Sequence, residues 1–161
     1  MFDCVSVADG LAALDAVGAR RRKRVLVTGS RFWTSAQVVA EALSGVLKPG
    51  QVLIEGEARG ADRIAADVGV ELEAFVLGFP APWARYGRSA GPRRNELMLA
   101  MRPAVVVAFS DDVKASKGTR HCMSVAWELG LPIRLFDSSG ASQSFQRAEP
   151  VRGFDSLPVE L

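Results

Sequence analysis

Residues 24–56 read RVLVTGSRFWTSAQVVAEALSGVLKPGQVLIEG and contain one complete unit of strand, helix and strand. The apolar run at 25–27 ends at a Thr-Gly-Ser turn, which predicts a first strand and the loop after it. Apolar residues then recur at helical spacing over 38–47, and Lys-Pro-Gly at 48–50 ends that helix. A second strand follows at 52–54. Such a unit predicts two parallel strands joined by a crossover helix.

The same alternation of strands and helices continues to residue 136. Three further strands are predicted at 74–77, 104–109 and 132–136, and three further helices at about 61–72, from Pro92 onward and from Gly118 to Gly130. The run AVVVAF at 104–109 is apolar throughout, which indicates a central strand covered on both faces. The pattern predicts the α/β class, with a doubly wound, mostly parallel sheet of five strands and helices on both faces.

The chain has 161 residues, of which 48% are hydrophobic and 24% charged, and these values are typical of one globular domain. Residues 24–137 are predicted to form this domain. Residues 1–23 are predicted to be an N-terminal appendage, a weak helix followed by a basic run at 20–24. That run fits a solvated entrance to the first strand better than an arm for nucleic acid. Residues 138–161 are predicted to be a tail that is loosely attached or used in self-association.

Composition excludes several classes of protein. The net charge of +2 is too small to require nucleic acid or an anionic membrane as a partner. Cys4 and Cys122 lie far apart and His121 is the single histidine, so we expect no metal site, no disulfide framework and a reducing, cytoplasmic location. No apolar run reaches the roughly 18 residues of a membrane helix, and Asp3 and Asp9 stand where a signal peptide is basic. We expect no membrane partner and no cofactor.

Ligands of doubly wound sheets bind at the carboxyl ends of the strands, where the strand order reverses. All four loops expected at this edge are basic, with Arg31, Arg59, Arg85, Arg88, Arg93, Arg94, Lys114, Lys117 and Arg120. Several of these cations stand at the start of a helix, where the helix dipole disfavours them unless an anion binds. Arg93 and Arg94, directly after Gly91-Pro92, are the clearest case. Each single cation has an alternative role in solvent or in an ion pair, but the whole set favours an anionic ligand.

Four glycines mark places where backbone could approach this ligand, namely Gly29, Gly56, Gly60 and Gly118. The hydroxyl of Thr119 adds a donor at a helix start, and its alternative role is an ordinary N-cap. For Asp62 we prefer the N-cap role. Loop aromatics could stack on a base or cover the edge of the core: Trp33, Phe79, Trp83 and Tyr86. Neither GxGxxG nor GxxxxGK[ST] occurs, which argues against an NAD dehydrogenase and excludes a P-loop NTPase.

Three motifs resemble the cpYpsA-related, YspA-type branch of the SLOG superfamily: TGSR at 28–31, GEARGAD at 56–62, and GPRRN at 91–95 followed by Met98. The resemblance spans about residues 24–136. It implies a Rossmann-like fold and a nucleotide or nucleotide-derived, ADP-ribose-like ligand. Together with the loops above, the motifs assign ligand binding to Gly29, Ser30, Arg31, Gly56, Arg59, Gly60, Asp62, Arg94, Asn95, Gly118 and Thr119.

A related branch, the Lonely Guy phosphoribohydrolases, cleaves the base from nucleoside monophosphates with an Arg at a helix start and a Glu in a PGGxGTxxE loop. Arg94 matches that Arg and is the best candidate for a catalytic residue, and residues 118–119 match the Gly-Thr pair. Cys122, however, stands at the Glu position, and a thiol supplies no charge to an oxocarbenium-like transition state. His121 fits a hydrogen-bond donor or a surface residue better than an acid or base.

The sequence therefore predicts a module that binds or senses a nucleotide. The first alternative is an enzyme that hydrolyses the N-glycosidic bond of nucleoside monophosphates. The second is a binder of single-stranded nucleic acid, because the superfamily also resembles the Rossmann-like domain of the DNA processing protein and the predicted site is rich in arginine. We expect a homodimer in each case, since related domains are commonly dimers and Trp33 and Trp83 are large apolar residues in loops.

Overall fold

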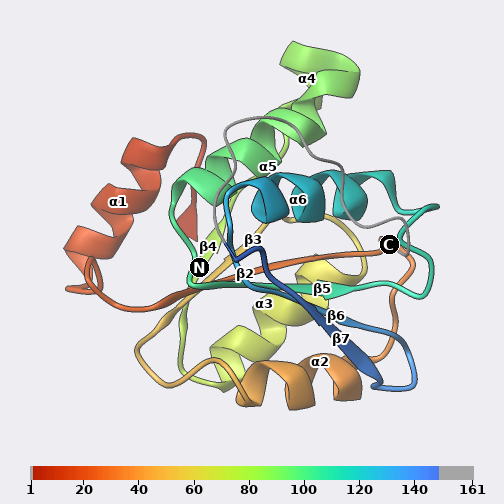
Figure 1. Ribbon diagram of the computed structural model, residues 1–161. Helices are drawn as coiled ribbons and strands as arrows, with labels where there is room; N and C mark the ends of the chain where they lie inside the picture. Colours follow the sequence, from red (N-terminus) through yellow and green to blue (C-terminus); the bar gives the residue numbers. More distant parts are fainter. Residues whose placement is uncertain (1, 149–161) are drawn as a thin grey trace.

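The structure, a computed structural model, describes residues 2–148. In this part of the chain seven strands form one sheet in the order β1-β4-β3-β2-β5-β6-β7 (Figure 1). Neighbouring strands are parallel except for the last pair, β6 and β7. The strands are β1 (Phe2–Asp3), β2 (Arg24–Gly29), β3 (Val52–Glu55), β4 (Phe75–Gly78), β5 (Val105–Phe109), β6 (Ile133–Phe136) and β7 (Ser142–Phe145).

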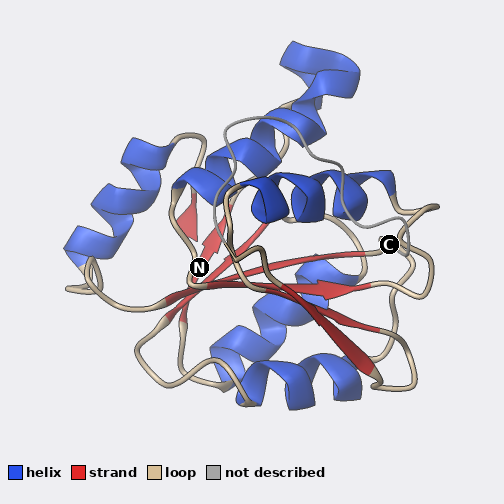
Figure 2. Ribbon diagram, viewed as in Figure 1, coloured by secondary structure: helices blue, strands red, loops and turns tan. Residues whose placement is uncertain are grey.

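Helices cover both faces of the sheet (Figure 2). They are α1 (Val7–Ala16), α2 (Ala36–Ser44), α3 (Ala61–Glu71), α4 (Trp83–Tyr86), the 3-10 turn η1 (Gly87–Ser89), α5 (Ala90–Ala100) and α6 (Lys117–Glu128). The pair α2 and α3 packs on one face, and α1, α5 and α6 pack on the other. Among the residues described, no helix has the length and apolar character that a membrane crossing requires.

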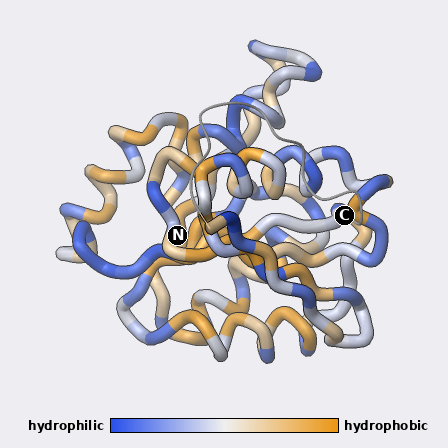
Figure 3. The backbone as a smooth tube through the Cα atoms, in the orientation of Figure 1, coloured by the Kyte–Doolittle hydropathy of each residue, from blue (hydrophilic) through white to orange (hydrophobic). Residues whose placement is uncertain are grey.

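Alternation along the strands divides the core into two layers. In β2, Val25 and Val27 pack toward α2 and α3, whereas Leu26 packs toward α5 and α6. All of β5 is buried, and it lies between β2 and β6 as the apolar run at 104–109 predicts. Hydrophobic residues accordingly follow the strands in Figure 3. The predicted fold class, a Rossmann-like doubly wound sheet, is confirmed. The strand predicted to be central, β5, is an interior strand next to the middle strand, β2.

The predicted number of strands, five, is wrong because each end of the chain adds an edge strand. Two residues, Phe2 and Asp3, pair with β4 in parallel, and Ser142–Phe145 pairs with β6 in the antiparallel direction. The first strand is too short to form a pattern, and the second is mostly polar and exposed. Neither carries the apolar run by which a buried strand is recognised in sequence. Residues 149–161 of the predicted tail lie outside the described part of the chain.

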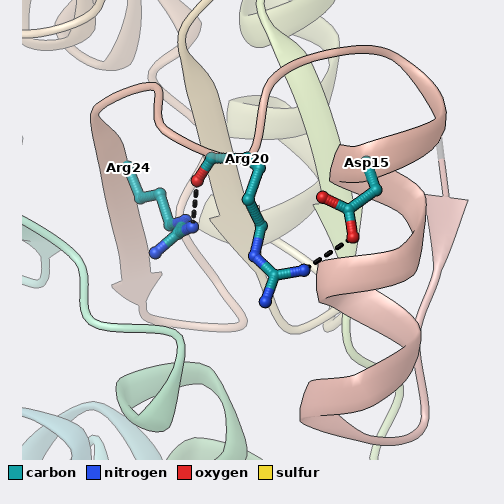
Figure 4. A network of polar contacts seen from close by, with 3 residues as sticks. All are labelled: Asp15, Arg20 and Arg24. Atoms are coloured by element: carbon teal, nitrogen blue, oxygen red, sulfur yellow. Dashed lines mark hydrogen bonds and ion pairs between the residues drawn. The ribbon is translucent and has the colours of Figure 1, made fainter.

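The segment predicted as an N-terminal appendage also contributes to the core, because Leu14 of α1 is fully buried against the sheet. Its basic run enters β2 at the amino end of the sheet. Arg20 forms a 2.6 Å ion pair with Asp15 (Figure 4). Arg24 donates to the carbonyl of Arg20 at 2.6 Å and to that of Met101 at 2.9 Å. These contacts fasten the chain where the first long strand begins.

Candidate ligand-binding cleft

The strand order reverses between β2 and β5. From β2 the chain builds β3 and β4 on one side, and then crosses to β5 and β6 on the other. The loops after β2 and β5 therefore diverge, which opens a crevice at the carboxyl ends of the two strands. A cavity of about 650 Å³ lies there, lined chiefly by residues within 28–33, 88–98 and 110–121 together with Asp62. We refer to it as the main cleft.

Most of the predicted ligand-binding residues come together in this cleft. Those that line it are Gly29, Ser30, Arg31, Asp62, Arg94, Asn95, Gly118 and Thr119. Gly56 and Arg59 line an adjoining cavity of about 310 Å³, formed mainly by residues 56–59, Arg63 and Pro80-Ala81, which we call the side hollow. Gly60 lines neither. The two cavities share four wall residues: Arg31, Ala58, Trp83 and Arg94.

The start of α6 points its backbone N–H groups at the main cleft. Its N-cap residue, Ser116, makes no capping hydrogen bond with its side chain, and no described residue accepts from the N–H groups of residues 117–119. Gly118 is exposed, and a Cβ placed on it would meet no atom within 4 Å. Thr119 lies inside the first turn and is not the N-cap. Free N–H groups and the positive end of a helix dipole form a site for an anion.

Fewer cationic side chains line the main cleft than the sequences of its loops predict. Arg31, Arg88, Arg94 and Lys117 line it, whereas Arg59 lines only the side hollow. Arg85 and Arg93 pack on Tyr86, with guanidinium carbons 5.0 and 4.4 Å from the ring centroid. Lys114 lines a separate hollow beside Asp137. Arg120 is exposed and lines none of these cavities.

Arg94 and Asp62 hold the loop after β3 from both sides. The buried guanidinium of Arg94 donates through Nη1 to the carbonyls of Gly56 and Phe79, the latter at 3.3 Å. Asp62 Oδ2 accepts the N–H groups of Gly56 at 3.1 Å and Ala58 at 3.3 Å. The N-cap of α3 is Gly60, so the preferred N-cap role of Asp62 is wrong. Its side chain turns back to the loop. Because the Nε of Arg94 also donates to Asn95 Oδ1, at 3.0 Å, Arg94 offers a ligand chiefly its third nitrogen, Nη2.

Three of the four glycines are required by packing between loops. A Cβ on Gly29 would collide with Ala61, and one on Gly56 would collide with the Arg94 guanidinium. Gly60 has a φ of 75°, a conformation that favours glycine, and a Cβ there would collide with the carbonyl of Ser30. Of the four, Gly118 alone has open space where a Cβ would stand, while Gly29 lines the main cleft and Gly56 the side hollow.

A group of buried or half-buried carboxyls lies behind the loop after β3. Burial, and then the charge of Asp62, raises the pKa of Glu55 to about 8. Its Oε2 accepts the N–H of Glu57 at 2.5 Å, and its buried Oε1 has no hydrogen-bond partner among the residues described. Burial also raises the pKa of Glu57 to about 7 and that of Asp62 to about 6. In each case burial disfavours the charged form of the carboxyl and so raises its pKa.

Cys122 and His121 are neighbours in sequence but face different surroundings. The Cys122 thiol is fully buried, and burial followed by the charge of Asp62 raises its pKa to about 12. It lies in the core and does not line the cleft. His121 lines the cleft, and its Nδ1 lies 3.3 Å from the amide nitrogen of Asn95, which also donates to the carbonyl of Gly118 at 3.1 Å. Asn95 therefore fixes both the imidazole and the start of α6.

Of the four aromatic residues expected near the ligand, Trp33 and Trp83 line the main cleft. Trp33 and Phe79 are buried in the core. Trp83 is 47% exposed, and the Arg31 guanidinium carbon lies 5.3 Å from its ring centroid. Phe32, which the sequence did not single out, is 82% exposed at the cleft, with the Arg59 guanidinium carbon 5.6 Å from its ring. Its position next to Arg31, directly after a buried strand, was the available signal.

Fold and site together define a class: a Rossmann-like α/β domain with its candidate site at the topological switch point of the sheet. The model of the YspA, cpYpsA-related SLOG family matches residues 23–86. The chain is also 39% identical over 122 residues to the Gene 61 protein of Mycobacterium phage D29. The aligned region covers 71% of this chain and 96% of the phage protein. The chain belongs to the YspA, cpYpsA-related SLOG family, as its three motifs predict.

Among solved structures, the chain is similar to DNA processing protein A from Streptococcus pneumoniae. The TM-score is 0.59 and the sequence identity 19%, over 73% of this chain and 50% of that one. The chain thus spans half the length of that protein. A likeness at this identity shows the shared fold.

Proposed function

We propose that this domain binds or senses a nucleotide or a nucleotide-derived, ADP-ribose-like ligand in the main cleft. The observation that carries the proposal is the start of α6, where the N–H groups of residues 117–119 have no acceptor among the described residues and face the switch point of the sheet. A phosphate satisfies several such donors at once, and the dipole of a helix of 12 residues favours its charge.

Side chains around this helix start support the same ligand. Lys117, Arg31 and Arg88 line the cleft, and none has a carboxylate of a described residue within 4.0 Å. Phe32 and Trp83 expose aromatic surface beside them. Aromatic faces stack on bases at a gain of about 1 to 3 kcal/mol per base, and cations nearby bind phosphate. The combination suits a ligand with both a planar ring and a phosphate.

Hydrolysis of an N-glycosidic bond is the alternative within the same cleft, and the carboxylates there favour binding over it. Asp62 accepts two backbone N–H groups, Asp111 accepts that of Ser138 at 2.7 Å, and Asp112 accepts that of Ala115 at 3.2 Å. Each acid that lines the cleft thus has an oxygen engaged in loop structure. The position expected to hold a catalytic glutamate carries a buried thiol instead, Cys122.

The alternative macromolecular ligand is single-stranded nucleic acid, which the name of the structural relative, a DNA processing protein, suggests. A strand would place several phosphates on the arginines and stack bases on the exposed aromatics. Its affinity would rise with strand length and fall steeply with salt.

We also propose a homodimer. Of the two tryptophans expected at its interface, Trp83 is exposed and Trp33 is buried. Light scattering after size exclusion measures the oligomeric state.

The experiment uses Gly118→Leu, which adds a side chain in open space beside the free N–H groups. Isothermal titration with nucleoside monophosphates, NAD and ADP-ribose should give binding to the native chain and at least a tenfold loss in the variant. Ala12→Leu, on the exposed face of α1, is the matched control and should bind as the native chain does. Chromatography of the same mixtures detects a released base. Unchanged affinity in Gly118→Leu would contradict the proposal, and release of a base would establish the hydrolase.

A further inference from the structure

The side hollow opens beside the main cleft and is the more basic of the two relative to its size. Four arginines line its 310 Å³: Arg31, Arg59, Arg63 and Arg94. Its one lining carboxylate, Glu57, lies more than 4.0 Å from each guanidinium, as does every other described carboxylate. None of the four arginines thus forms an ion pair within the described chain, although the charges of Arg63 and Arg94 act on Glu57 and those of Arg94 and Arg31 act on Asp62. The volume is at the lower limit of small-molecule sites.

The wall between the two cavities is built so that one molecule can reach both. Arg31 lies across the ring of Trp83 at 5.3 Å, and both residues line the main cleft and the side hollow. Arg94, anchored through Nη1, also faces both. A group that leaves the main cleft past Trp83 therefore meets Arg59 and Arg63 next. Arg59 is held in place by Phe32, whose ring its guanidinium covers.

We propose that the side hollow is a second anion subsite, so that the ligand is a nucleotide-derived small molecule with a second phosphate group, bound by Arg59 and Arg63. This inference rests on the proposed function, because the first phosphate and the base occupy the main cleft. A ligand of this kind uses both cavities and the shared wall, whereas a nucleoside monophosphate leaves the side hollow to water. The second phosphate accordingly adds affinity and selects against monophosphates.

The test compares three phosphorylated forms of each of the four ribonucleosides by isothermal titration: the 5′-monophosphate, the 5′-diphosphate and the 3′,5′-bisphosphate. At least one doubly phosphorylated form should bind tenfold or more tightly than its monophosphate. The double variant Arg59→Ala/Arg63→Ala should lose this advantage. Arg63→Ala, which leaves Arg59 on the Phe32 ring, should reduce the advantage and keep the affinity for the monophosphate. Arg59→Lys/Arg63→Lys, which retains both charges, should recover part of the advantage.

The control is Arg21→Ala/Arg22→Ala, which removes two exposed arginines near the amino end of β2 and lowers the net charge equally. It should leave all affinities unchanged. Equal binding of mono- and diphosphorylated forms, or an advantage that survives in the double variant, would overturn the second subsite and leave the proposed function intact. No binding of any of these nucleotides, nor of NAD and ADP-ribose, would instead refute the proposed function. Affinity that keeps rising with the length of an oligonucleotide would overturn the small-molecule ligand.

Discussion

Replacing Glu55 with Gln should change how the stability of this domain depends on pH. The carboxyl is buried at the end of β3, and its pKa is raised from the ordinary 4.5 to about 8. Between these two values the folded chain holds a proton at Glu55 that the unfolded chain has lost. The free energy of unfolding therefore falls as the pH rises from about 4.5 to about 8. Glu57 and Asp62, whose pKa values are also raised, add to the fall in the same direction.

The size of the effect follows from the same values. The pKa of Glu55 rises from 4.5 to about 8, and each pKa unit corresponds to about 1.4 kcal/mol. The loss of unfolding free energy due to Glu55 over this pH range is therefore at most about 5 kcal/mol. Relaxation around a buried charge reduces it, so we expect Glu55 to account for about 2 to 5 kcal/mol. For a domain of this size, that loss lowers the melting temperature by roughly 4 to 20 °C. In Glu55→Gln the glutamine is neutral throughout, and this part of the slope should vanish.

Urea unfolding followed by far-UV circular dichroism at pH 5, 6, 7 and 8 measures the two curves. The native chain should lose stability over this range, and Glu55→Gln should lose clearly less. Glu96→Gln, at an exposed position of α5, removes a carboxyl from the surface and should give a curve parallel to that of the native chain. Parallel curves for the native chain and Glu55→Gln, or stability that rises with pH, would refute the reasoning.

Three further predictions concern the loop after β3 and the core behind the cleft. Gly56→Ala should destabilise the fold by at least about 2 kcal/mol, because its Cβ meets a buried guanidinium. Gly118→Ala should stabilise α6 by up to about 1 kcal/mol, because its Cβ meets no atom and alanine favours a helix. Thermal melts in which Gly56→Ala is the more stable of the two variants would contradict this. Asp62→Ala leaves two N–H groups without their acceptor and should cost about 2 to 4 kcal/mol in urea unfolding, and a cost below 1 kcal/mol argues against the loop clamp. Cys4 and Cys122, with pKa values raised to about 11 and 12, should react with a thiol reagent at pH 8 only after unfolding, and fast labelling of the native chain would contradict their burial.

The fold could be predicted from sequence where apolar residues occur in unbroken runs or at helical spacing. The buried interior strand at 104–109 and the helices between strands follow from such patterns because burial on a known face fixes the residue type. The edge strands could not be found in this way. Phe2–Asp3 is held by the neighbouring strand alone, and Ser142–Phe145 presents polar residues to solvent.

The site was predictable to the extent that strand ends determine it. The loops after β2, β4 and β5, together with the starts of α5 and α6, supply residues to one cleft because parallel strands bring their carboxyl ends to one edge. Contacts between loops were not predictable. Three features depend on tertiary packing: Nη1 of Arg94 donates to two carbonyls, the carboxylate of Asp62 turns back to the loop after β3, and Gly118 is the one of the four predicted site glycines that faces open space. Sequence indicates which residues are near a site, and packing decides which remain free to act.

The contact between Gly56 and Arg94 also constrains how this sequence can vary. Any side chain at position 56 occupies the space of the guanidinium, and a shorter residue at 94 leaves the carbonyl of Gly56 without its donor. Neither position can therefore change alone without cost, although they are 38 residues apart. In a library randomised at both positions, survivors should keep the glycine and arginine pair or replace both together. The two positions are therefore expected to vary together and not independently.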